Sequence, residues 1–392
     1  MESYFFHQMP WSDYPEDFDE KYESSSGTFP NSFFDPVKGA ELYNRYLDEL
    51  EYADALGYDG ICLNEEHQNA FGGLMPSPNI VAGMLARRTK NAKIAILGNC
   101  LPLRANPLRV AEEIAMLDVT TRGRIISGFV RGAGCEYFCT DTNPTFSREM
   151  FYEAHDLIIR AWTEPGPFEY LGTHFQYRYV NLWPRPYTKP HPPVWLPSAG
   201  SSESVEFAAR HRYPFVPIIA PLNIVKRMLD SYRDSAREKF GYDPEPSLLG
   251  YGPLIYVADD DQKAREEAAQ HEEFATSKGY KMPLPILFPP GYVSDKSMRA
   301  FLAARAAYGS EGQVGSLGPS YVGSPRTVID ALIADYDFLG GFGFIIPDSG
   351  PGNVTHEQTI RNMTLFQNEV MPALKKYHAQ RGNSLGVMPS SL

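Results

Sequence analysis

The chain has 392 residues, of which 43% are hydrophobic, and its 36 Lys and Arg against 48 Asp and Glu give a net charge of -12. This length can bury one large core or two ordinary ones, and the acidic balance argues against nucleic acid or an anionic membrane as the main partner. No apolar run approaches membrane-spanning length, and the first residues lack a secretory signal. Cys62 and Cys100 fall in or beside predicted strands, and Cys135 and Cys139 are too few and wrongly spaced for a usual zinc site, so we expect a cytoplasmic protein with reduced thiols and no metal.

The hydrophobic pattern predicts strands that alternate with helices. A first strand is expected within residues 3–11, followed by a long irregular segment, 12–35, that we interpret as a lid. Asp35-Pro36 then predicts a helix start, with Asp as N-cap and Pro at the first helical position, and Gly57 predicts its end. The remaining strands are expected at 59–63, 93–98, 124–130, 193–196, 214–219, 249–257 and 342–346, and the remaining helices at 77–89, 107–118, 147–162, 201–211, 222–238, 260–276, 325–338 and 355–378.

Strands alternating with helices predict parallel pairing. Eight such units without a dinucleotide-binding or P-loop fingerprint favour an α/β fold with a closed (β/α)8 TIM barrel over an open doubly wound sheet. We expect a single domain over 1–392, with insertions at about 12–35, 164–192 and 278–320. The second insertion reads as a hairpin, and the third as irregular except for a helix near 295–308.

The ends of the fourth and fifth strands suggest an anion site. The sequence SAGSSES, residues 198–204, opens a helix, where free backbone N–H groups and the helix dipole favour negative charge. An ordinary Ser-capped helix would explain that segment alone. Arg131 follows the neighbouring strand and Arg148 begins the next helix, and Arg side chains bind phosphate through two parallel hydrogen bonds. We therefore expect a phosphate site.

The second strand ends in Asn64, Glu65, Glu66, His67 and Gln68. His67 could be a core histidine with a satisfied ring, but its place at a polar strand end favours proton transfer. The two glutamates are adjacent and point to opposite sides, so they cannot by themselves form the carboxylate pair of a glycosidase. A zinc hydrolase would need histidines at other strand ends, and His7 is the other candidate there.

These residues resemble the bacterial luciferase-like flavin-dependent monooxygenases over most of the chain. GYDGICLNEEHQ is similar to the family strand that ends in Glu-His-His, and VGSPRTVIDALI and TLFQNEVMPALKKY resemble later segments. Gln68 replaces the second histidine, Val130 stands at luciferase's reactive cysteine, and Gly200-Ser201 replaces its Glu-Ser pair, so light emission is not implied. The family pattern between these segments is matched by Leu101, Pro102, Pro107, Arg109, Ala111, Glu112, Leu117, Asp118, Gly123, Arg124, Gly128, Arg131 and Gly132.

The resemblance implies a barrel that binds reduced FMN and uses O2 to oxygenate a small organic substrate through a flavin peroxide. The catalytic residues implied are His67, as proton manager, and Glu66, which orients it. A non-prolyl cis peptide is expected beside residues 98–100, and we expect His67 and Arg131 to flank one flavin cavity. The implied cofactor-binding residues are Asn99, Cys100, Arg131, Gly132, Arg148, Ser198, Gly200 and Ser201.

The resemblance also implies partners. A flavin reductase would supply reduced flavin, and a homodimer would form through helices 78–89 and 107–118. Aromatic residues in and near the 12–35 lid suggest an apolar substrate. Alternatives that stay open are direct use of NAD(P)H, a deazaflavin-dependent oxidoreductase, a non-catalytic flavin-binding protein and a barrel hydrolase.

Overall fold

Eight parallel strands form the centre of the molecule, in the order β8-β7-β4-β3-β2-β1-β12-β9. The structure, a computed structural model, describes residues 1–198, 201–218, 220–279, 282–295, 298–299, 302, 319–348 and 352–385. Bridges between Phe215 and Leu249 and between Ile218 and Gly252 join the two edge strands. The predicted (β/α)8 barrel is therefore confirmed. Its strands are β1 (Glu2–His7), β2 (Gly60–Leu63), β3 (Lys93–Cys100), β4 (Ile125–Val130), β7 (Val194–Ser198), β8 (Phe215–Pro217), β9 (Gly250–Tyr251) and β12 (Phe344–Ile345).

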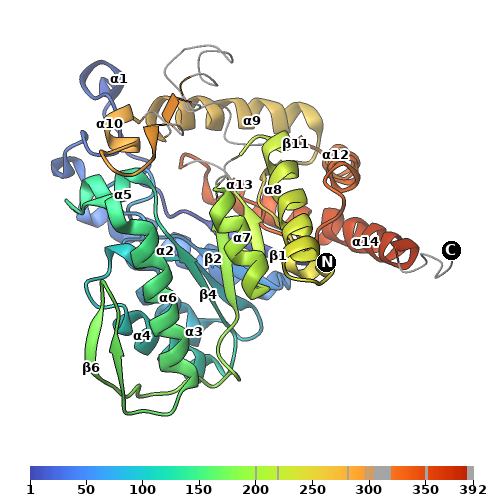
Figure 1. The fold of residues 1–392 in the computed structure, drawn as a ribbon. Coiled ribbons are helices and arrows are strands. Elements are labelled where there is room, and N and C mark those ends of the chain that lie inside the picture. Colours follow the sequence, from blue (N-terminus) through green and yellow to red (C-terminus); the bar gives the residue numbers. More distant parts are fainter. Residues whose placement is uncertain are drawn as a thin grey trace.

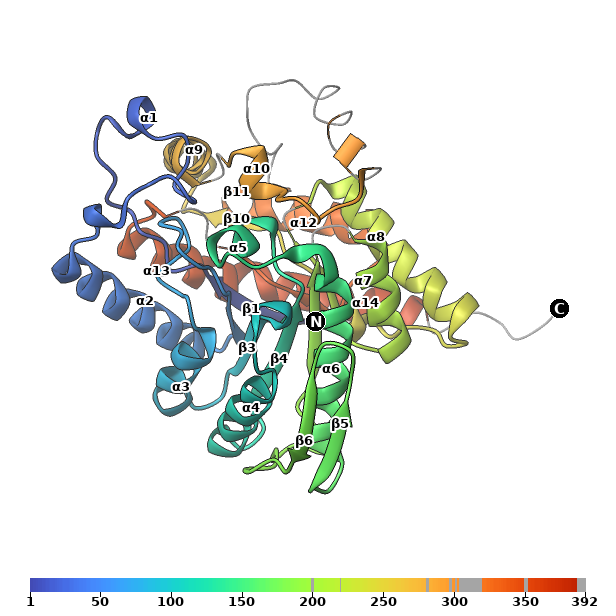
Figure 2. The ribbon, with the colours of Figure 1, turned by 60° about the vertical axis from the view of Figure 1, so that its left-hand side comes forward.

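Helices surround this barrel (Figure 1). The predicted start of α2 is confirmed in detail, because the Asp35 carboxylate accepts a hydrogen bond from the Val37 N–H, and Gly57 ends the helix with a φ of 82°. Three short helices, α1, α5 and α10, gather at the upper end of the molecule in both views (Figures 1 and 2). The helices are α1 (Phe18–Lys21), α2 (Pro36–Leu56), α3 (Pro78–Arg88), α4 (Leu108–Thr121), α5 (Gly134–Cys139), α6 (Ser147–Thr163), α7 (Ser202–His211), α8 (Leu222–Asp234), α9 (Asp261–Phe274), α10 (Leu284–Leu287), α12 (Pro325–Phe338), α13 (His356–Leu365) and α14 (Met371–Leu385).

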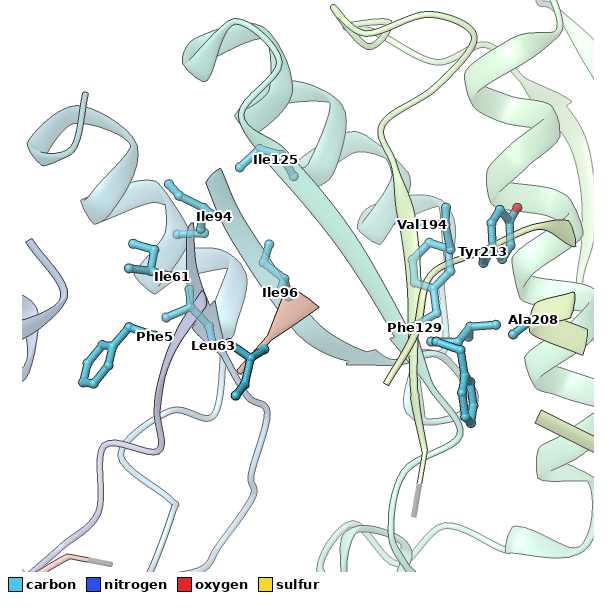
Figure 3. Close-up of a cluster of buried hydrophobic side chains, with 14 of the residues drawn as sticks. Phe5, Ile61, Leu63, Ile94, Ile96, Ile125, Phe129, Val194, Ala208 and Tyr213 are labelled. Carbon is cyan, nitrogen blue, oxygen red and sulfur yellow. The ribbon is translucent and has the colours of Figure 1, made fainter. Parts of the chain in front are cut away.

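Alternate strand residues build two apolar layers. The larger layer packs strands against helices, and Figure 3 shows part of it, including Phe5, Ile61 and Ile94. The smaller layer consists of strand residues and their close neighbours and fills the barrel itself, with Tyr4, Trp195 and Phe344 among its members. Because side chains alternate along a strand, this register decides which polar residues at each strand end face the barrel mouth.

One predicted strand is divided in the structure. Residues 249–257 do not form one strand but two, β9 in the barrel and β10 (Leu254–Val257) in a separate parallel pair with β11 (Ser320–Gly323), which the sequence did not reveal. Pro253 lies between β9 and β10, and proline has no N–H to donate to a ladder.

The predicted insertions differ in outcome. The hairpin in 164–192 is confirmed as β5 (Phe168–Leu171) paired antiparallel with β6 (Gln176–Val180), at the end of the molecule opposite to α5 and α10 (Figures 1 and 2). Most of the helix expected near 295–308 lies outside the described residues. Within the described part of the chain, each helix is too short or too polar to span a membrane.

Candidate functional site

The loops after β2, β3 and β4 meet at the carboxyl end of the barrel strands. The backbone N–H of Cys100 lies 3.4 Å from Glu65 Oε2, and the Cys100 thiol donates to the Arg131 carbonyl at 3.2 Å. Glu65 in turn contacts His67. The histidine and the arginine predicted to be functional are thus linked through β3 at one rim.

His67 is held by a buried carboxylate. Its Nε2 lies 2.9 Å from Glu65 Oε1, while the other Glu65 oxygen accepts a hydrogen bond from Arg104. The Glu65 side chain is only 2% exposed, against 20% for the His67 ring, so the ring faces outward from its partner. The carboxylate directs the ring proton to Nε2 and leaves the lone pair of the neutral ring at Nδ1.

The position of Glu66 corrects one prediction. We expected Glu66 to orient His67, but the carboxylate that contacts the ring belongs to Glu65. Adjacent residues point to opposite sides, and the Glu66 carboxyl lies instead with Glu136 and Cys135 of α5, their ligand atoms all within 4.8 Å of one another. Sequence reasoning missed α5, because nothing local in Gly134–Cys139 indicates that it packs beside the β2 loop.

The buried pair Glu66 and Glu136 holds a proton. Burial first, and the nearby Glu66 charge second, raise the pKa of Glu136 to about 10, and burial also raises the pKa of Glu66. Two carboxyl groups facing one another out of water cannot both ionise at neutral pH. The Glu66 carboxyl of the loop after β2 lies against Glu136 of α5, so the pair joins the loop that carries the histidine to α5. With Cys135, the same atoms could ligate a cation, but a shared proton accounts for them at neutral pH.

Arg131 and Arg148 line the same cavity. It is a small cavity of about 30 Å³ between β4, β7, α6 and α7. Arg131 Nη1 donates to Ser147 Oγ at 3.3 Å and to the Tyr292 carbonyl at 3.1 Å, and its guanidinium stacks 4.3 Å from the centre of the Tyr292 ring. The lining residues are Phe129, Val130, Arg131, Arg148, Phe151, Tyr152, Leu196, Pro197, Ser204 and Phe207.

The N-terminus of α7 already binds an anion of the protein itself. One oxygen of Glu203 accepts hydrogen bonds from Ser201 Oγ at 2.9 Å and Ser202 Oγ at 3.1 Å, and it lies 3.4 Å from Arg148 Nη1. Partial burial opposes ionisation of Glu203, but its own backbone N–H, Ser201 and Arg148 outweigh this and lower its pKa. The donors at this helix end are of the kind that bind a phosphate group, and Gly200 of the predicted site lies outside the described residues.

The end of β3 carries the predicted cis peptide. The Leu97–Gly98 bond is cis without a proline, and the β3–β4 register shifts between Ile96 and Asn99. Asn99 is fully buried, and neither polar atom of its side chain has a partner within the described ranges. An orphaned buried amide is a group that a ligand or water would satisfy. Burial raises the pKa of the Cys100 thiol, so it is a neutral donor there.

Gly132 and Ser198 also lie at this rim. Gly132 has a φ of 87° and accepts a hydrogen bond from the Tyr292 hydroxyl at 2.7 Å. Ser198 ends β7, is buried, and accepts the Ile218 N–H through its carbonyl at 3.1 Å.

We expect one cavity flanked by His67 and Arg131, but among the described residues the lining of the cavity beside Arg131 does not include His67. The reason is α5, which contacts both sides. Glu136 lies against Glu66 of the loop that carries His67, and the Tyr137 hydroxyl donates to the Arg131 carbonyl.

His7 points away from the mouth. Its Nε2 lies 2.8 Å from Glu49 Oε2 on α2, and its Nδ1 accepts the Met9 N–H at 2.9 Å. Nε2 thus joins β1 to α2 and Nδ1 is occupied by the backbone just after β1, which removes His7 as the second histidine of a barrel hydrolase.

The lid expected at 12–35 lies over the loop that follows His67. Ser26 forms a bridge with Asn69, and the Ala70 N–H donates to the Ser25 carbonyl at 3.3 Å. The aromatic rings of this segment pack on one another, so packing accounts for them and they no longer argue for an apolar substrate. These rings are Tyr14, Phe18, Tyr22, Phe29 and Phe33.

Comparison with known proteins points to one family. The model of the luciferase-like monooxygenases matches residues 26–341. The chain is 28% identical to an alkanal monooxygenase alpha chain of Photorhabdus luminescens, over 83% of this chain and 89% of that one. It is 27% identical to the oxygenase component of a flavin-dependent trigonelline monooxygenase of Acinetobacter baylyi, over 87% and 92% of the two chains. Its fold is similar to the oxygenating constituent of 3,6-diketocamphane monooxygenase from Pseudomonas putida, solved with FMN, at 20% identity and a TM-score of 0.71 over 95% and 98% of the chains.

Proposed function

Because the chain belongs to the luciferase-like monooxygenase family, we propose that it is an oxygenase that uses reduced FMN and O2 to oxygenate a small organic substrate. The observation that carries the proposal is the pairing of two features at one rim. An anion site with two guanidinium groups and serine hydroxyls lies at the same end of the barrel as a histidine held by a buried carboxylate.

The phosphate of FMN would take the place of the Glu203 carboxylate. Arg131 and Arg148 would bind it with Ser201, whose hydroxyl donates to an anion already. Asn99, whose buried amide is unsatisfied, is a candidate to bind the flavin ring; the other predicted candidates at the rim are Cys100, Gly132, Ser198 and Gly200. When bound, reduced flavin supplies the electrons that activate O2.

His67 would manage the proton of this reaction. The Glu65 carboxylate, itself held by Arg104, keeps the ring in one orientation and makes it a better base at Nδ1. Contacts between the 12–35 segment and the loop after His67 would keep water from the ring. A deazaflavin-dependent oxidoreductase of the same fold is the alternative, because it would use the same anion site with a different cofactor.

Two partners are part of the proposal. A separate reductase would supply reduced FMN, in keeping with the relative that is named an oxygenase component. A homodimer would form through α3 and α4, which pack side by side and expose Ile80, Met84, Met116 and Val119.

The test follows the fate of reduced FMN. Photoreduced FMN is mixed with the protein without O2 and then exposed to O2 in a stopped-flow instrument. We expect the wild-type protein to change the rate of flavin reoxidation relative to free FMN. His67→Ala should bind FMN normally but alter that rate, and Arg131→Ala should lose binding. Reoxidation identical to that of free FMN, or binding of a deazaflavin in preference to FMN, would contradict the proposal.

A further inference from the structure

Glu203 differs from Glu206, the other acidic residue of α7, in what it contacts. Ser201 is the N-cap residue of α7, yet its hydroxyl donates to Glu203 and makes no capping bond to the helix backbone. Ser202, the first helical residue, donates to the same carboxylate oxygen, and Arg148 reaches that oxygen from α6. One carboxylate therefore collects donors from two helices.

These are the donors assigned above to the flavin phosphate. A carboxylate and a phosphate group cannot occupy the same hydroxyls and guanidinium together. A phosphate monoester carries more negative charge than a carboxylate and has three acceptor oxygens, so it can displace Glu203, but at the cost of breaking those contacts. After displacement, the Glu203 charge would still lie at the start of the helix, where it repels the phosphate.

We propose that Glu203 is an internal competitor for the phosphate site and sets how tightly, and how selectively, the protein holds a phosphate-bearing flavin. This inference rests on the proposed function, because it assumes that the FMN phosphate binds at α7. Riboflavin lacks the phosphate and leaves Glu203 in place. Glu203 thus weakens the binding of FMN without weakening the binding of riboflavin. Moderate affinity suits an oxygenase that receives its flavin from a separate protein.

The test compares two glutamates of one helix. Glu203→Gln removes the competing charge, and Glu206→Gln is the matched control, because Glu206 is also on α7 and half exposed but pairs with Lys239 at 2.6 Å. Binding of oxidised FMN and of riboflavin is measured by flavin fluorescence at constant ionic strength. The Glu203 pair with Arg148 is partly exposed, so we expect Glu203→Gln to bind FMN about three- to tenfold more tightly, with riboflavin unchanged.

Each outcome decides a separate question. If FMN affinity is unchanged or weaker in Glu203→Gln, the competitor role is wrong. The competitor role is also wrong if Glu203→Gln raises the affinity for riboflavin equally, or if Glu206→Gln raises the affinity for FMN as much. The effect would then come from the net charge of the protein and not from the position of Glu203. If the wild-type protein binds neither flavin, the proposed function itself fails.

Discussion

Replacing Glu65 by Gln tests the histidine assembly most directly. The substitution keeps the size and planar shape of the side chain but removes its charge. The buried carboxylate holds two charge-assisted contacts, to His67 and to Arg104, and a bond of that kind contributes about 1.5–3 kcal/mol. The amide of Gln can keep only part of this stabilisation, because it cannot accept hydrogen bonds from both His67 and Arg104 as a carboxylate does.

If one such contact is lost at the reacting histidine, the rate should fall roughly 10- to 150-fold. The assay is the reoxidation of bound reduced FMN in the stopped-flow instrument, together with FMN affinity and melting temperature. Affinity should change less than about twofold, since Glu65 lies outside the residues that line the cavity beside Arg131.

Glu66→Gln is the matched control, since it changes the adjacent residue by the same atoms. The Glu66 carboxyl lies with Glu136 and not against the His67 ring, so an amide there leaves the Glu65 carboxylate in contact with the ring. We expect its rate to stay within about threefold of wild type. Equal losses in the two variants, or a larger loss in Glu66→Gln, would refute the assignment of Glu65 as the partner of His67.

Three further predictions concern binding and stability. Arg131→Lys should weaken FMN binding by roughly tenfold or more in a fluorescence titration, because Lys cannot form the paired hydrogen bonds of a guanidinium; unchanged affinity would place the phosphate elsewhere. Glu136 keeps its proton up to about pH 10 when folded but releases it near its ordinary value when unfolded, so the free energy of unfolding should fall from about pH 5 to pH 10, by at most about 1.4 kcal/mol per pH unit. Urea unfolding at pH 6 and pH 9 should show this slope in wild type and not in Glu136→Gln, and equal slopes would exclude the buried protonated pair. Glu49 is fully buried between His7 and Arg45, so Glu49→Ala should lower the free energy of unfolding by about 3–5 kcal/mol, and a loss below about 1 kcal/mol would show that the network does not hold β1 to α2.

Local sequence patterns predicted most elements of this barrel. The cap at Asp35, the stop at Gly57 and the alternation of strands with helices depend on contacts within a few residues, which a single segment contains. The same holds for the candidate functional positions at strand ends. Arg131 and His67 follow β4 and β2 directly, so the topology of a parallel barrel alone brings them to one rim.

The partners of those residues were decided by tertiary structure. Adjacent glutamates precede His67, and nothing in their spacing tells which one turns toward the ring, because that depends on Arg104 and α5 arriving from elsewhere in the chain. The division of 249–257 into two strands and the outward direction of His7 likewise depend on pairing with residues far away in sequence. A strand end determines where a side chain begins, but the charge and hydrogen bonds around its tip come from separate segments, and only the packed fold brings those segments together.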